Sequence, residues 1–146
     1  MDPRQLEKAL AFYEAALAAD DFSSKSEAAD CHYKRGEVLR WQKADPDEYI
    51  AEFQQAIEFD PRHPWAHILL GLSIYERDKD ATMAEAELLE ALELAPQNKW
   101  AYYHLGEIYR QEERTGEAVA MCERALEIDP TFEAAQKRLV ALRDEK

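Results

Sequence analysis

The chain has 146 residues, of which 47% are hydrophobic and 34% charged, the composition of one globular domain large enough to bury a core. Its net charge of −13, from 31 acidic and 18 basic residues, repels phosphate backbones and anionic lipid, so we expect neither a nucleic-acid nor a membrane partner. No apolar stretch approaches the length of a membrane span. The same charge favours encounter with basic or neutral partners, and it also keeps a protein soluble.

The N-terminal sequence and the cysteines predict a cytoplasmic protein. Residues 1–8 are charged and lack the apolar core of a signal peptide. Cys31 and Cys122 lie far apart and form no CxxC pair, so reduced and inert thiols are the simplest interpretation.

The predicted elements are helices throughout, because no segment alternates apolar and polar residues as a half-buried strand does. Residues 3–22 contain the first helix, which begins at the cap residue Asp2. Ala9, Tyr13 and Ala16 follow at the spacing of one helix face. This spacing matches the second helix of each later unit, so the segment is interpreted as half a repeat.

Residues 24–62 contain the next two helices. A capping box from Ser24 to Glu27 begins the first of them. Asp45-Pro46, followed by Glu48, gives the second a cap residue, a first-turn proline and a capping-box acid.

The remaining chain repeats this plan. Residues 63–97 contain a helix that starts at Pro64 and a second that ends before Pro96, and residues 98–130 contain a similar pair. Residues 131–146 contain a last helix whose charged face can meet water.

Three independent markers recur at nearly one interval along the chain. Glycines are spaced by 35 and 35 residues, and alanines and prolines each by 35 and 34. A constant interval of this size indicates stacked helical hairpins, because one hairpin cannot bury its apolar face alone. The markers are Gly36, Gly71 and Gly106, Ala56, Ala91 and Ala125, and Pro61, Pro96 and Pro130.

These markers resemble the tetratricopeptide repeat, whose helix-turn-helix unit has the pattern W-x2-L-G-x2-Y, then A-x3-F, A and P. The match is weakest in the first unit. In the third unit the eight positions carry Tyr102, Leu105, Gly106, Tyr109, Ala118, Cys122, Ala125 and Pro130. The resemblance implies an all-α fold, a right-handed α-α superhelix of about eight helices in antiparallel hairpins. Residues 1–146 then form one domain, with a half repeat at 3–22, repeats at 24–62, 63–97 and 98–130, and a capping helix at 131–146.

The resemblance also implies that the first helix of each unit lines a concave groove. The positions expected to be exposed there give an apolar and aromatic middle between Glu and Arg residues. Aromatic side chains anchor interfaces, so we predict a protein or peptide partner with apolar side chains. The candidate groove residues are Tyr33, Glu37, Arg40, Trp65, Ile68, Leu72, Tyr75, Trp100, Tyr103, Glu107 and Arg110.

Two alternatives stay open for these residues. Trp65 and Trp100 lie near helix starts, where each ring can cover a neighbouring loop instead of facing solvent. Glu37 and Arg40, and likewise Glu107 and Arg110, are spaced i,i+3, so the two opposite charges of each pair can form an ion pair with each other instead of with a partner.

One known variant of the family grips a C-terminal carboxylate with Lys, Asn and Arg side chains from successive first helices. The matching positions here carry Tyr33, Glu37, Leu69, Trp100 and His104, and none of them fits. We therefore do not expect this mode of binding.

The sequence does not indicate an enzyme, a metal site or a cofactor. His63 and His67 are spaced i,i+4, but His63 precedes Pro64 and is expected at the helix cap instead of within the helix. Three of the four glycines are repeat markers, which leaves no glycine-rich phosphate loop.

The leading functional interpretation is a non-catalytic adaptor or chaperone-like module that binds a peptide segment in the groove. The alternative is a self-assembling scaffold, a homo-oligomer in which the groove or a cap helix packs against another copy. A remote alternative is an RNA-binding helical repeat, since pentatricopeptide repeats also span 35 residues, but the charge of −13 argues against it.

Overall fold

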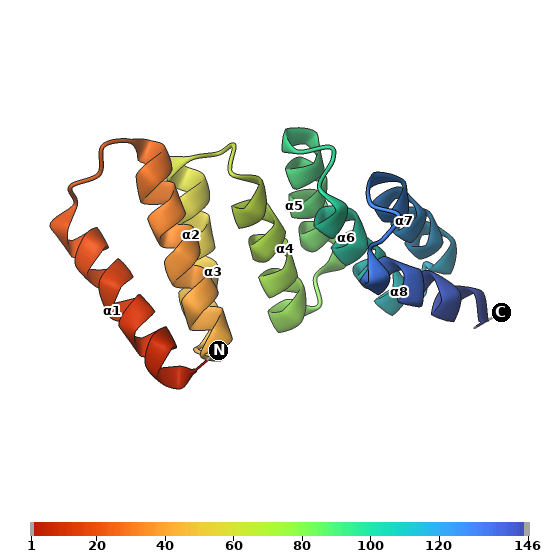
Figure 1. The fold of residues 1–146 in the computed structure, drawn as a ribbon, viewed down its shortest axis with the longest axis horizontal. Coiled ribbons are helices and arrows are strands. Elements are labelled where there is room, and N and C mark those ends of the chain that lie inside the picture. Colours follow the sequence, from red (N-terminus) through yellow and green to blue (C-terminus); the bar gives the residue numbers. More distant parts are fainter. Residues whose placement is uncertain (1, 145–146) are drawn as a thin grey trace.

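The computed structural model describes residues 2–144, which form eight helices and no strand (Figure 1). Met1 and residues 145–146, which belong to the predicted 1–146 domain and 131–146 capping segment, lie outside the described residues. Over the described part of the chain, no helix combines the length and apolar character needed to cross a membrane. The helices are α1 Pro3–Ala19, α2 Lys25–Trp41, α3 Pro46–Phe59, α4 Pro64–Asp78, α5 Ala81–Leu94, α6 Lys99–Gln111, α7 Thr115–Ile128 and α8 Glu133–Asp144.

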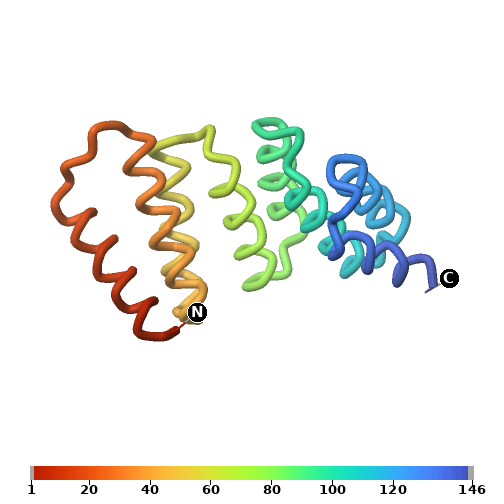
Figure 2. The backbone as a smooth tube through the Cα atoms, viewed as in Figure 1, coloured from red at the N-terminus to blue at the C-terminus, as the bar shows by residue number. Residues whose placement is uncertain are grey.

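The helices pair in sequence and the pairs stack into an all-α superhelix. Within the pairs, α2 packs closely against α3, α4 against α5 and α6 against α7. Smaller contacts between α3 and α4, and between α5 and α6, join consecutive pairs, while α1 and α8 cover the two ends. Figure 2 follows the tube from the N-terminal end of this stack to the C-terminal end. The predicted fold class is therefore confirmed.

Side-chain caps begin several of these helices. The Asp2 carboxylate accepts a hydrogen bond from the Arg4 backbone N–H (3.1 Å), and α1 ends at Ala19 because Asp20 adopts the left-handed conformation (φ 49°). Ser24 Oγ accepts from the Glu27 N–H (3.2 Å), as the predicted capping box requires. The reciprocal bond differs, because the Glu27 carboxylate accepts from Ser23 instead of from Ser24.

The three repeated glycines lie in equivalent surroundings. Each faces the second helix of its own unit so closely that an added Cβ would lie nearer to a Cβ on that helix than an ordinary van der Waals contact allows. The first helix can approach this far only because no side chain intervenes. The facing pairs are Gly36 with Glu52 (3.1 Å), Gly71 with Glu87 (3.1 Å) and Gly106 with Met121 (3.2 Å).

The repeated alanines serve the same close packing from the other side. Ala56, Ala91 and Ala125 are all fully buried. Larger side chains such as Phe53 and Leu105 belong to core clusters that span consecutive units. Small residues at the closest helix contacts, surrounded by large residues in shared clusters, are what the stacking model predicts.

Candidate functional site

The first helices of consecutive units lie side by side and are bridged at each step by a polar contact. Helices α2, α4, α6 and α8 therefore form one face of the stack, which we call the wall, and α4 also contacts α6 directly. Several of the bridging residues are predicted groove residues. The bridges are Arg40 to Glu76 between α2 and α4, the Tyr75 hydroxyl to Glu112 Oε1 (2.7 Å) between α4 and the end of α6, and Arg138 Nη2 to Glu107 Oε2 (2.8 Å) between α8 and α6.

The charged residues of the predicted groove are held by partners within the protein. Glu37 pairs with Lys34 at 2.7 Å and not with Arg40, so the expected pairing within the first unit is wrong. Glu107 does contact Arg110, at 3.7 Å, as expected in the third unit. Both of these pairs lie within one helix, whereas Arg40 and Glu107 also take part in the bridges between consecutive first helices.

Three predicted groove residues are buried, contrary to the expectation that they are exposed. Ile68 has 0% exposure, and Tyr33 and Tyr75 are nearly as inaccessible. Ile68 and Tyr75 lie in the core cluster that joins α4 to the following units, because stacking covers this side of the helix. Tyr33 packs on the ring of His63, with centroids 4.8 Å apart. Burial, together with the hydrogen bond to Glu112, raises the pKa of Tyr75 to about 12.

The accessible part of the predicted set is apolar and aromatic. Trp65 and Trp100 are each 40% exposed, while Leu72 and Tyr103 are half-buried. The two tryptophans line one cavity of about 510 Å³, together with residues 95–99 at the α5–α6 connection. Both tryptophans thus border the α5–α6 connection across this cavity, and each remains 40% exposed.

Trp100 belongs to an aromatic cluster at the C-terminal end of the wall. Its ring meets Phe132 edge-on at 4.7 Å and stacks on His104 at 6.0 Å, while Tyr103 lies 5.5 Å from Phe132. Burial, and to a smaller degree the charge of Arg40, lowers the pKa of His104 to about 4. The imidazole is therefore neutral at neutral pH, and the cluster holds Trp100 in one orientation.

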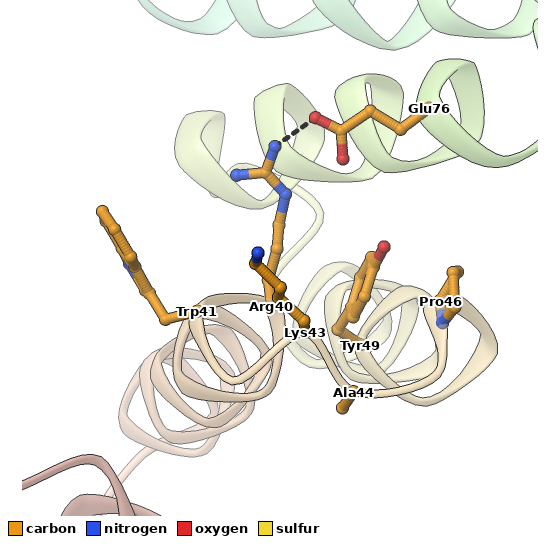
Figure 3. A pocket seen from close by; sticks show the side chains of 7 residues that line it. All are labelled: Arg40, Trp41, Lys43, Ala44, Pro46, Tyr49 and Glu76. Carbon is orange, nitrogen blue, oxygen red and sulfur yellow. Dashed lines mark hydrogen bonds and ion pairs between the residues drawn. The ribbon is translucent and has the colours of Figure 1, made fainter. Parts of the chain in front are cut away.

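A second cavity, of about 550 Å³, lies where the α2–α3 turn faces α4 (Figure 3). Figure 3 shows Arg40 reaching across to Glu76, with Trp41 on one side of it and Tyr49 on the other. Trp41 is 65% exposed, and Lys43 stands beside Arg40. Sequence reasoning missed this cavity. The sequence held one indication of it: Trp41 is aromatic, whereas positions 76 and 111, which are equivalent in the next two units, carry polar residues.

Two histidines form equivalent links inside their units. His32 Nδ1 lies 2.9 Å from Glu52 Oε2, and His67 Nδ1 lies 2.7 Å from Glu87 Oε2. Burial alone would lower the pKa of His67, but hydrogen bonds to Glu87 and to the Pro61 carbonyl oxygen outweigh it and raise the pKa. Both ring nitrogens of His67 lie within hydrogen-bond distance of acceptor oxygens, so the charged imidazolium form of His67 is favoured.

Side chains with metal-binding or nucleophilic chemistry have structural partners. His63 caps α4 by accepting from the Ala66 N–H (3.1 Å), as predicted, and its other ring nitrogen lies 3.0 Å from Asp30. Among the described residues, no group of three or more His, Cys, Asp or Glu side chains could hold a metal ion. Cys31 and Cys122 are both buried, and burial raises the pKa of each thiol.

The stacked antiparallel helix pairs are typical of helical-repeat proteins, and comparisons with known proteins identify the family. Tetratricopeptide-repeat profiles match residues 66–98 and 100–132, which overlap most of the second and third predicted units. The chain is a tetratricopeptide-repeat protein. Repeats of this family are typically non-catalytic. A search of curated protein sequences finds no match.

Solved structures share the fold at low sequence identity. A crystal structure of MamA has a TM-score of 0.80 and 22% identity over 99% of this chain and 85% of that one. The first tetratricopeptide domain of Spaghetti (RPAP3), bound to the HSP90 peptide SRMEEVD, has a TM-score of 0.75 and 24% identity over 82% and 94%. YrrB, described as having an unusual peptide-binding site, has a TM-score of 0.75 and 22% identity over 92% and 66%.

Proposed function

We propose that this chain is a non-catalytic protein-interaction module whose first-helix wall binds a peptide segment with apolar or aromatic side chains. The observation that carries the proposal is the pair Trp65 and Trp100. The two rings occupy the same position of consecutive units, are each 40% exposed and line one cavity with the loop at residues 95–99. Exposed tryptophans beside a preformed cavity are the usual anchors of an interface.

The rest of the wall supports binding by keeping this site rigid. The bridges between consecutive first helices fix the spacing of the units, and the cluster with Phe132 holds the Trp100 ring. A preorganised surface loses little conformational freedom when its partner binds, so more of the contact free energy remains as affinity. Leu72 and Tyr103, both half-buried, extend the apolar surface along the wall.

Structural neighbours support a peptide as the partner. Spaghetti (RPAP3) was solved with a bound peptide, and YrrB is described by its peptide-binding site. We do not expect this chain to bind an acidic peptide like that of the first neighbour, because the positions that would bind its carboxylate carry residues such as Glu37 and Trp100. With a net charge of −13, this chain favours a partner that is apolar at the cavity and neutral or basic around it. This mode of binding suits an adaptor or chaperone-like role.

Panning a random peptide library against the purified protein tests the proposal. Selected peptides should be rich in aromatic and aliphatic residues, and their affinity is then measured by isothermal titration calorimetry. We expect Trp65→Ala and Trp100→Ala each to weaken binding by about 10-fold to 100-fold, the range of an interface anchor.

Trp41→Ala is the matched control, because it removes a more exposed tryptophan from the other cavity. Its affinity should stay close to that of the wild type. Unchanged binding by both the Trp65 and Trp100 variants, or an equal loss in the Trp41 variant, would show that the peptide binds elsewhere.

A further inference from the structure

The polar link inside the first two units is replaced by apolar residues in the third. In the second unit His67 pairs with Glu87 (2.7 Å), and the first unit contains an equivalent pair. The same two positions of the third unit carry Tyr102 and Met121. Both of these side chains are partly buried against the core cluster of α5, α6 and α7. Helices α6 and α7 therefore meet at this place through apolar contacts and not through an ion pair.

A third apolar residue faces this place from the preceding unit. Leu89 of α5 stands where α3, one repeat earlier, carries Gln54. Its side chain is 45% exposed, and it is the one exposed leucine in the described part of the chain. Packing within the protein therefore does not account for a leucine at this position.

These residues line a cavity of about 350 Å³, which we call the α5–α7 cavity. Ligand sites span about 300–1,000 Å³, so a cavity of this size suits one large apolar side chain. The lining residues are Leu89, Leu92 and Glu93 of α5, Tyr102, Leu105 and Tyr109 of α6, and Met121 of α7.

Glu93 gives this cavity a negative charge without an internal partner. It lies in the last turn of α5, where the helix dipole is negative and no basic residue is present. Glu58, at the same position of α3, accepts a hydrogen bond from Gln55 (2.9 Å). Glu127, at the same position of α7, forms an ion pair with Arg124 (2.5 Å), whereas Glu93 has no such partner in the described part of the chain. A cation brought by another molecule would therefore interact favourably with Glu93 and with the end of α5.

We propose that the α5–α7 cavity is a second docking site, which binds a basic amphipathic segment of a partner protein. One large apolar side chain of the segment enters the cavity between Leu89 and Met121, and a neighbouring Lys or Arg pairs with Glu93. Burial of the exposed part of Leu89 stabilises the complex. The net charge of −13 attracts a basic segment and repels an acidic one.

This site is separate from the tryptophan cavity. The two cavities share no lining residue. Trp100 and Tyr102, two residues apart on α6, point in directions that differ by about 200° around the helix axis, so the cavities lie on opposite sides of α6. The proposal therefore does not depend on peptide binding at the tryptophans. With both sites, one chain holds two partners at once, as an adaptor does.

Isothermal titration calorimetry with the helical peptide LKKLLKLLKKLLKL, which has a leucine face bordered by lysines, tests the proposal. The wild type should bind it with a dissociation constant below about 100 µM. Leu89→Gln gives α5 the side chain that α3 has at this position and should weaken binding by about 10-fold. Met83→Gln is the matched control, because Met83 is also an exposed apolar residue of α5 but lies outside the cavity. Its affinity should stay within about 2-fold of the wild type.

A pair of glutamate variants separates the site from the general charge of the protein. Glu93→Lys should weaken binding by about 10-fold, because attraction of the peptide's lysines is replaced by repulsion. Glu58→Lys changes the net charge equally, at the same position of α3, and should weaken binding by less than about 3-fold. Equal losses in the two variants would show that the peptide responds only to net charge, and would overturn the proposal.

Nuclear magnetic resonance of isotope-labelled methionine methyl groups locates the bound peptide. The Met121 signal should shift during the titration, whereas the Met83 signal should stay in place. Trp65→Ala and Trp100→Ala should bind this peptide as the wild type does, whatever they do to binding at the tryptophan cavity. No binding at about 500 µM peptide, an unmoved Met121 signal at saturation, or equal losses in the Leu89 and Met83 variants would each contradict the second site. Circular dichroism checks that every variant is folded.

Discussion

Adding one methyl group at the repeated glycines should destabilise the protein in an order set by what the new Cβ meets. At Gly36 the Cβ would lie 2.6 Å from Cε1 and 3.0 Å from Cδ1 of Phe53, whose ring is fully buried and has no room to retreat. Overpacking of this kind costs about 1–3 kcal/mol, and the 2.6 Å overlap puts Gly36 at the upper end of that range, while the better helix propensity of alanine offsets about 1 kcal/mol. We expect Gly36→Ala to lower the free energy of unfolding by about 2 kcal/mol.

The other two repeated glycines should respond less. At Gly71 the Cβ would meet the backbone carbonyl oxygen of Ala84 at 3.0 Å, which only a shift of the helix can relieve, so a loss of about 1 kcal/mol is expected. At Gly106 the nearest atom is Met121 Cβ at 3.2 Å, and packing and propensity should nearly cancel to within about 0.5 kcal/mol.

Gly116 provides the matched control for this series. It is also helical, in α7, but an added Cβ has no neighbour within 4 Å, so Gly116→Ala should stabilise the protein by about 0.5 kcal/mol. Urea unfolding followed by far-UV circular dichroism measures all four variants. A Gly36 variant as stable as the wild type, or a Gly116 variant as unstable as the Gly36 variant, would refute close helix approach as the reason for the repeated glycine.

Three further predictions concern side chains of the first helices α4 and α6. The pKa of His104 is lowered to about 4 in the folded protein, so its contribution to stability is present above about pH 6.5 and is lost as pH falls. The free energy of unfolding, measured with urea, should therefore decrease between pH 7 and pH 5, and His104→Gln should make this decrease smaller by about 2 kcal/mol. The pKa of His67 is raised, so its contribution is present below about pH 6.5 and is lost as pH rises; the stability difference between wild type and His67→Gln should be larger near pH 5.5 than near pH 9. Ile68→Ala should lower the free energy of unfolding by about 2–5 kcal/mol, as a truncation in the core does, and a loss below about 0.5 kcal/mol in the same assay would place Ile68 at the surface after all.

The fold could be predicted from sequence because its causes are local and periodic. Gly36, Gly71 and Gly106 report where helices touch, and residues such as Asp2 and His63 report where helices begin. Both kinds of signal involve atoms close in sequence or separated by one constant interval. The environments of the glycines are therefore the part of the sequence interpretation that the structure confirms most closely.

The candidate site could be predicted only in part because exposure depends on how one unit rests on the next. Ile68 lies on the predicted face of α4, but the following units cover it. Glu37 pairs with Lys34 while Arg40 reaches to α4, and the choice between these partners depends on the distance between first helices. The cavity beside Trp41 exists only where the α2–α3 turn meets α4, so no single repeat contains its pattern.

The contact between a bound peptide and the paired tryptophans can be measured directly by fluorescence. In a Trp41→Phe variant the only remaining tryptophans are Trp65 and Trp100. Titration with a library-selected peptide should shift their emission to shorter wavelength, because the exposed faces of both rings leave water. Unchanged emission at saturation, with binding established by calorimetry, would contradict a binding site at the cavity that these two residues share.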